Sequence, residues 1–161
     1  MKYLIKQKVF SIPEKFYIYD EFGEELYLCK GEFLTFASKL HLYDKEGNEI
    51  LYIREKLFSL LHKIYVYKDG KEVSEIIKKL SLFKPYYDIY PQKWGIKGDF
   101  FEHEYQIISQ NNLVATISKK WFSWGDTYNI DVSDAYDDLI VLAIVLAIDI
   151  VNNRERNSSA N

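Results

Sequence analysis

Apolar and aromatic side chains alternate with polar ones along most of the chain between residues 3 and 132. Residues 16–19, 64–67 and 128–132 show this pattern most clearly, and they are rich in Tyr, Ile, Val and Phe, which favour strands. A period of two places one class of side chain on each face of a strand. The pattern therefore predicts a chain built mainly of β-strands, each with one face in a core.

Short turn segments separate these runs. Residues 20–23 and 44–47 share the spelling Asp-x-x-Gly and lie 24 residues apart, and a predicted strand follows each of them. Gly and Asn, which recur in residues 68–70 and 110–112, tolerate the positive φ that tight hairpins require. The repetition predicts successive antiparallel hairpins in one sheet.

Two segments are less regular. Residues 73–82 also fit one helical face, but we favour a strand because the neighbouring segments are strands. Pro85 and Pro91 bracket residues 86–90. Proline cannot donate to a strand ladder, so this segment is predicted to be an edge strand or a short strand.

A helical pattern begins after Val132. Ser133 or Asp134 can cap a helix, and Asp137 and Asp138 suit its first turn, where the helix dipole favours negative charge. Ten apolar residues, 139–148, follow without a polar position. Such a helix must be surrounded on all sides by a membrane, another subunit or a closed barrel. A membrane span needs about 20 apolar residues, which argues against the first.

A closed barrel can surround this helix if it has enough strands. A helix about 10 Å across needs more than the eight strands whose inward side chains already fill a barrel. About twelve strands of about six residues, joined by turns of about four, fit into the chain together with the helix. We therefore predict a mainly β fold, a closed antiparallel barrel of about 12 strands around a central hydrophobic C-terminal helix. It forms a single domain over residues 1–152, followed by a flexible polar tail at 153–161.

Net charge, cysteine content and the placement of the histidines argue against several classes of function. The 21 Lys and Arg residues against 24 Asp and Glu give a net charge of −3, which argues against a general nucleic-acid binder. Cys29 is the single cysteine, so an internal disulfide framework is excluded, and its strand context favours a packed thiol. His41, His62 and His103 are isolated, and no catalytic spelling occurs. We expect no enzymatic activity and no cofactor.

Residues 117–128, Ile-Ser-Lys-Lys-Trp-Phe-Ser-Trp-Gly-Asp-Thr-Tyr, precede a short strand and an apolar helix that ends Ala147-Ile148-Asp149. This order resembles the LURP-one-related family, including its small bacterial members, which belongs with the tubby C-terminal domain and the phospholipid scramblases. The resemblance implies a tubby-like barrel of about twelve antiparallel strands around a central helix. Tubby domains bind phosphoinositides through basic residues on the barrel, and scramblases are membrane-associated and calcium-responsive. This chain lacks the cysteine-rich palmitoylation stretch of the scramblases.

Two clusters of cations are candidate binding sites. Residues 54–84 carry eight Lys or Arg against four acids, a local charge of +4, while the remainder of the chain carries −7. A molecule polarised in this way could meet a phosphate or an anionic membrane with one side. The second cluster combines cations with indole rings, which suits a membrane interface, a cation–π contact or stacking on a ligand ring. The candidate ligand-binding residues are Lys78, Lys79, Lys84, Lys119, Lys120, Trp121 and Trp124.

Each cluster has a structural alternative. The lysines can form a solvated face that protects strand edges, and the tryptophans can cover the mouth of the barrel. The aspartates between 126 and 149 match no EF-hand spacing, and helix capping explains several of them, so we predict no metal site. Asp149 lies near the helix C-terminus, where the dipole disfavours it, and should be neutralised by a Lys or Arg of the barrel rim or by backbone amides. We assign structural roles to Asp149, Asp126 and Tyr128.

These observations predict a non-enzymatic binding or scaffold module with an anionic ligand on a basic barrel face. An anionic phospholipid or a phosphoinositide is the expected ligand. The alternatives are a protein-interaction module that uses exposed aromatic residues, which make up 17% of the chain, and an enzyme with an unrecognised site. The N-terminus lacks the hydrophobic region of a signal peptide, so we expect a cytoplasmic protein, peripheral at the membrane when lipid-bound, without a transmembrane span.

Overall fold

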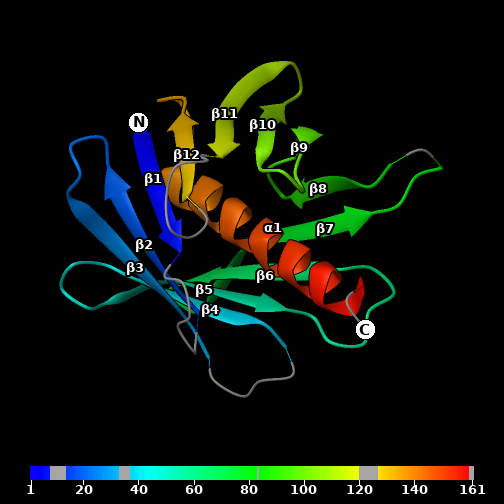
Figure 1. Ribbon diagram of the computed structural model, residues 1–161, viewed down its shortest axis with the longest axis horizontal. Helices are drawn as coiled ribbons and strands as arrows, with labels where there is room; N and C mark the ends of the chain where they lie inside the picture. The colour runs from blue at the N-terminus through cyan, green and yellow to red at the C-terminus, as the bar shows by residue number, and fades with distance from the viewer. Residues whose placement is uncertain (8–13, 33–36, 83, 120–126, 160–161) are drawn as a thin grey trace.

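The structure is a computed structural model that describes residues 1–7, 14–32, 37–82, 84–119 and 127–159. In these ranges the chain forms twelve strands and one helix (Figure 1). The elements are β1 (Lys2–Gln7), β2 (Lys15–Asp20), β3 (Glu25–Gly31), β4 (Lys39–Tyr43), β5 (Glu49–Glu55), β6 (Lys63–Lys68), β7 (Lys71–Lys79), β8 (Tyr86–Tyr90), β9 (Trp94–Asp99), β10 (Glu104–Ser109), β11 (Asn112–Lys119), β12 (Thr127–Val132) and α1 (Asp138–Ser159).

The strands form a closed barrel in which every strand pairs antiparallel with its neighbours in the sequence, and β1 closes the ring against β12. The inward positions pair across the sheet. Ile76 on β7 lies opposite Ile64 on β6 and Ile89 on β8, and all three are almost completely buried. The predicted barrel of about twelve strands is therefore confirmed. The segment bracketed by the two prolines is the five-residue β8, a short strand of the closed ring.

Helix α1 crosses the middle of the barrel (Figure 1), and all its residues from 140 to 152 are buried. Asp137 caps it, because its Oδ1 accepts hydrogen bonds from the backbone N of Leu139 at 2.9 Å and of Ile140 at 3.3 Å. The prediction of Ser133 or Asp134 as the cap is corrected by this geometry. Closure of the sheet around an entirely apolar helix segment removes that segment from water.

The helix continues beyond the boundary predicted from sequence. We expected a flexible polar tail from residue 153, whereas α1 extends to Ser159. The reason is that its last polar residues have partners on the barrel. Arg154 lies 3.1 Å from Glu55 of β5, and Glu155 lies 2.5 Å from Lys78 of β7.

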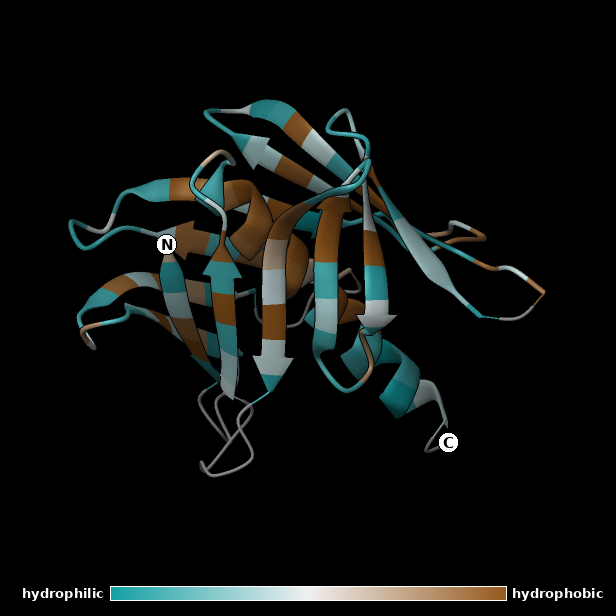
Figure 2. Cartoon of the chain, turned by 90° about the horizontal axis from the view of Figure 1, so that it is seen from above, coloured by the Kyte–Doolittle hydropathy of each residue, from teal (hydrophilic) through white to brown (hydrophobic). Residues whose placement is uncertain are grey.

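The antiparallel order places alternate connections at opposite ends of the barrel. At the turn end, where α1 begins, tight turns connect the strands, and Asp20 Oδ1 accepts backbone hydrogen bonds from Phe22 and Glu24, each at 2.9 Å. The predicted hairpin turns are thus confirmed. At the helix-exit end, where α1 finishes, the β5–β6 loop (residues 56–62) and the β7–β8 loop (80–85) project beyond the barrel (Figures 1 and 2).

Candidate functional site

The basic segment 54–84 is divided between the two ends of the barrel. Lys56 and Lys84 lie in the loops at the helix-exit end, whereas Lys68 and Lys71 flank the turn between β6 and β7 at the opposite end. The remaining four cations of the segment lie on strands. The eight cations therefore do not share one face.

Three strand lysines have acidic partners within the protein. Lys78 is 4% exposed, and its Nζ lies 2.5 Å from Glu155 and 4.7 Å from the centre of the Phe101 ring. Lys79 Nζ lies 2.6 Å from Asp88 Oδ2, and the hydrogen bond to Asp88 raises the pKa of Lys79 above its ordinary value. Lys63 lies 3.6 Å from Glu75. These acids compensate the charge of the lysines. Lys78 therefore connects β7 to α1, and Lys79 connects β7 to β8.

Lys84 differs from these, because it is exposed at the end of the β7–β8 loop. The loop is closed by Ser81, whose hydroxyl donates to the Lys84 carbonyl at 2.5 Å and whose oxygen accepts from the Lys84 backbone N at 3.1 Å. Lys119 uses its backbone N to bind Glu104 Oε1 at 2.9 Å. The other candidate residues of that motif, Lys120, Trp121, Trp124 and Asp126, lie outside the described residues.

The two loops at the helix-exit end expose large apolar side chains. Relative to a fully exposed reference, Phe58 is 103% exposed, Leu60 104%, Leu80 74% and Leu82 98%. The tips of both loops are brown in the hydropathy colouring of Figure 2. Residues 56–62 and 80–85 contain Lys56 and Lys84 and no acid. Each loop thus combines exposed apolar groups with one cation that pairs with no acid among the described residues. The sequence did not reveal this combination, because exposure cannot be read from an apolar pattern.

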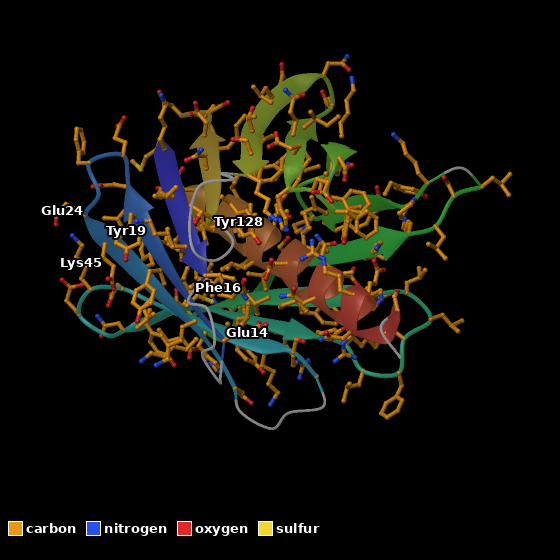
Figure 3. The ribbon with its side chains drawn as sticks, in the orientation of Figure 1. Glu14, Phe16, Tyr19, Glu24, Lys45 and Tyr128 are labelled. Carbon is orange, nitrogen blue, oxygen red and sulfur yellow. The ribbon has the colours of Figure 1, made fainter. Side chains whose placement is uncertain are left out.

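Inside the barrel, Asp149 of α1 binds groups from two elements. The Tyr128 hydroxyl on β12 donates to Asp149 Oδ1 at 2.9 Å, and Asn153 Nδ2 donates to Oδ2 at 3.0 Å. His103 Nε2 lies 3.7 Å from the same Oδ1, and its ring stacks on Tyr128 at 4.1 Å. Figure 3 shows Tyr128 against the helix. We predicted a rim cation or backbone amides as partners; the described residues add a tyrosine hydroxyl and an asparagine amide as donors.

A second polar cluster joins the end of α1 to β5, the β5–β6 loop and β7. Glu55 is only 3% exposed and lies 3.2 Å from His62 Nδ1 and 3.1 Å from Arg154 Nη2. Neighbouring His62 Nε2 lies 3.9 Å from Glu155 Oε1. Burial of a carboxylate is tolerated when opposite charge and hydrogen bonds surround it. The cluster therefore fixes the position at which the helix leaves the barrel, next to the base of the β5–β6 loop.

A recess of about 400 Å³ lies beside the helix C-terminus, between α1 and strands β3 and β4. Its cations face acids already, since Lys39 lies 2.8 Å from Glu32 and Arg154 contacts Glu55. Glu14 also lines it, and burial raises the pKa of the Glu14 carboxyl. The recess has mixed charge and offers no concentration of positive charge for a phosphate.

The outer face of β4, β5 and β6 carries a row of rings. His41 stacks on Tyr52 at 4.9 Å, and Tyr52 lies 5.7 Å from Tyr67. Beside the two tyrosines is a shallow hollow of about 280 Å³ that Glu49 and Asp69 also line. Such cross-strand pairs stabilise a sheet, and they also provide an aromatic surface.

Within the described ranges, no group of three or more His, Cys, Asp or Glu side chains is arranged to hold a metal ion. The thiol of Cys29 is completely buried, and burial raises its pKa, as expected for the packed thiol that the sequence predicted. No helix in the described part of the chain combines the length and the apolar character needed to cross a membrane.

The fold places the protein in the class of twelve-stranded antiparallel barrels that a C-terminal helix traverses. The sequence model of the LURP-one-related family matches residues 1–149, and the chain belongs to this family. It is 34% identical over 155 residues to the uncharacterized protein YxjI of Bacillus subtilis (strain 168), an alignment that covers 96% of each chain. The X-ray structure of a protein from Arabidopsis thaliana has the same fold, with a TM-score of 0.64 at 15% identity, over 94% of this chain and 91% of that one.

Proposed function

We propose that this protein is a non-enzymatic module that binds anionic phospholipid surfaces through the helix-exit end of its barrel. The observation that carries the proposal is the difference in charge between the turn-end connections and the two long loops of the helix-exit end. The connections at the turn end contain seven acids against two lysines, whereas the β5–β6 and β7–β8 loops contain two lysines and no acid. Glu14, Glu32 and Glu102 lie in the other helix-exit connections, so the basic part of this end is the pair of loops. The acids are Glu21, Glu24, Asp44, Glu46, Asp69, Asp134 and Asp137, and the lysines opposed to them are Lys45 and Lys93.

This polarity orients the molecule in front of an anionic surface. Glu24 and Lys45, labelled in Figure 3, lie at the turn end, away from the C-terminus of α1. An anionic membrane attracts a nearby Lys by about 1 kcal/mol and repels acids by a comparable amount, over about one Debye length. The β5–β6 and β7–β8 loops are therefore the part of the helix-exit end that approaches the lipid.

The basic face predicted from sequence has a different part in this proposal. Lys78 and Lys79 are paired with Glu155 and Asp88, so they support the strands from which the loops extend. Lys84 remains a lipid-facing residue, and Lys56 joins it.

Co-sedimentation with liposomes tests the proposal. Vesicles of neutral phosphatidylcholine are compared with vesicles containing phosphatidylserine or a phosphoinositide, at low and at physiological salt. The Lys56→Glu/Lys84→Glu variant is compared with Lys68→Glu/Lys71→Glu, which makes the same charge change at the opposite end. Loss of two lysines at about 1 kcal/mol each predicts at least about 30-fold weaker binding for the first variant and little change for the second.

Two results count against the proposal. Equal loss in both variants would mean that net charge, and not the helix-exit end, governs attachment. Absence of binding to every vesicle would remove the lipid function altogether.

A protein partner is the second candidate function, and the ring row of His41, Tyr52 and Tyr67 favours it. Aromatic side chains are enriched at the centres of protein interfaces. A Tyr52→Ala variant that loses a partner in a pull-down, while the partner persists at high salt, would support this candidate. Liposome binding that is unchanged in the same variant would show that the two surfaces are separate.

A further inference from the structure

The two loops carry four of the most exposed apolar side chains among the described residues. Phe58, Leu60 and Leu82 are exposed on nearly all sides, with values of 103%, 104% and 98%, and Leu80 is 74% exposed. Exposed apolar residues that cluster at one place mark a surface that meets an apolar environment. Charge alone does not require them, since Lys56 and Lys84 would attract lipid without them.

We infer that the tips of the β5–β6 and β7–β8 loops enter the hydrocarbon boundary of an anionic bilayer, with Phe58, Leu60, Leu80 and Leu82 as the inserting residues. The inference rests on the proposed function and adds to it the part of the lipid that these residues contact. Burial of these apolar side chains in the bilayer then adds to the electrostatic attraction between the lysines and the lipid.

The barrel topology places both tips where they can reach the same bilayer. β6 pairs with β7, so the two loops belong to adjacent hairpins and emerge at the same end. At this end the register runs from Lys63 opposite Ile77 to Lys79 opposite Tyr86, which starts the two loops from neighbouring positions. Figures 1 and 2, which differ by a right angle, both show the loops projecting on the side where α1 ends.

The order of residues in each loop matches the layers of a membrane interface. Lys56 precedes the apolar tip of the first loop, and Lys84 follows that of the second. Lysine can extend its ammonium group to the phosphate layer while apolar neighbours lie deeper. Tyr86, which is 40% exposed, begins β8 just beyond Lys84, and tyrosine is favoured at headgroup level. Flat contact with a protein would instead favour a continuous patch, which separate protruding tips do not offer.

Backbone hydrogen bonds close the base of the β5–β6 loop in the lipid-free protein. Lys56 N donates to the Lys63 carbonyl at 2.8 Å, and Lys78 N donates to the His62 carbonyl at 2.9 Å. Phe58 itself has a φ of 54°, a left-handed conformation that residues other than glycine seldom adopt. Phe58 is fully exposed in this conformation, so insertion does not require the loop to refold.

Site-specific labelling tests the inference directly. Cys29 is the single cysteine and is 0% exposed, so a thiol-reactive NBD probe labels an introduced cysteine selectively. Phe58→Cys is compared with Phe22→Cys, because Phe22 is 86% exposed at the opposite end of the barrel. With phosphatidylserine vesicles, the probe at 58 should shift to the blue and be quenched by spin labels on the acyl chains. The emission of the probe at 22 should remain that of a water-exposed probe, with and without vesicles.

The results of this experiment distinguish failure of loop insertion from failure of the proposed lipid binding. Protein that sediments with vesicles while the probe at 58 still reports water would overturn insertion alone. Protein that does not sediment with any vesicle would overturn both.

Replacement of the inserting leucines provides a second readout. Leu60→Ser/Leu82→Ser should weaken liposome binding by about tenfold or more for each leucine, whereas Phe22→Ser should leave it unchanged. Because all three positions are exposed, thermal melting should show each variant folded like the parent protein. A dimer in lipid-free solution that Leu60→Ser/Leu82→Ser dissociates would assign the tips to a second copy of the chain and overturn the inference.

Discussion

The contact between Tyr128 and Asp149 is the polar interaction inside the barrel with the clearest energetic consequence. Asp149 is 3% exposed, and the Tyr128 hydroxyl reaches its Oδ1 at 2.9 Å. Tyr128→Phe removes that donor and keeps the ring that stacks on His103. A hydrogen bond to a charged group contributes about 1.5–3 kcal/mol, so we expect the free energy of unfolding to fall by about 2 kcal/mol. For a chain of this size the melting temperature should fall by about 4–8 °C.

Tyr105→Phe is the matched control for this variant. Tyr105 is also buried, at 3% exposed, but its hydroxyl has no hydrogen-bond partner among the described residues. Loss of a buried hydroxyl without a partner removes a desolvation cost, so stability should stay within about 0.5 kcal/mol or rise. Urea unfolding and thermal melting measure both variants. If Tyr128→Phe were as stable as Tyr105→Phe, Asp149 would not depend on the hydroxyl, and the reasoning would be refuted.

Three further predictions concern other parts of the barrel. Gly98 has a φ of +125°, and a Cβ there would lie 2.6 Å from the Glu104 carbonyl oxygen, so Gly98→Ala should destabilise by at least about 2 kcal/mol in urea unfolding. Cys29 is buried and burial raises its thiol pKa, so a chromogenic disulfide reagent should react with it only in denaturant; rapid reaction of the folded protein would contradict this. A hydrogen bond from Lys39 holds the pKa of Glu32 below its ordinary value. The stabilisation by ionised Glu32 is therefore complete above the pKa of Glu32 in the unfolded chain, and it is lost as the pH falls through the pKa in the folded protein. Glu32→Gln should therefore lower the melting temperature slightly at about pH 7 and not at about pH 3.

The architecture could be derived from the sequence because one element constrained the rest. A helix that is apolar on every side between residues 139 and 148 must be enclosed, and the strands with alternating apolar residues could form a barrel around it. The helix cap was placed a few residues too early because Ser133, Asp134 and Asp137 all suit that role, and only backbone geometry shows that Asp137 Oδ1 accepts the bonds.

The site was less predictable because its features depend on contacts between distant residues. Lys78 and Glu155 are 77 positions apart, so their pairing, which removes Lys78 from the basic face, has no local signal. The same holds for the bond between Asp149 and Tyr128, which lie 21 positions apart on different elements. Alternation identifies the inward residues of a strand, but it does not show whether an apolar residue in a loop, such as Leu60, is covered or exposed.

Liposome co-sedimentation of the unmodified protein tests the central claim most directly. The account predicts binding to vesicles that contain phosphatidylserine, weaker binding as salt rises from low to physiological concentration, and at least about 30-fold weaker binding to neutral phosphatidylcholine. Equal binding to neutral and anionic vesicles, or none to either, would contradict the claim that the end of the barrel bearing Lys56 and Lys84 docks on an anionic lipid surface.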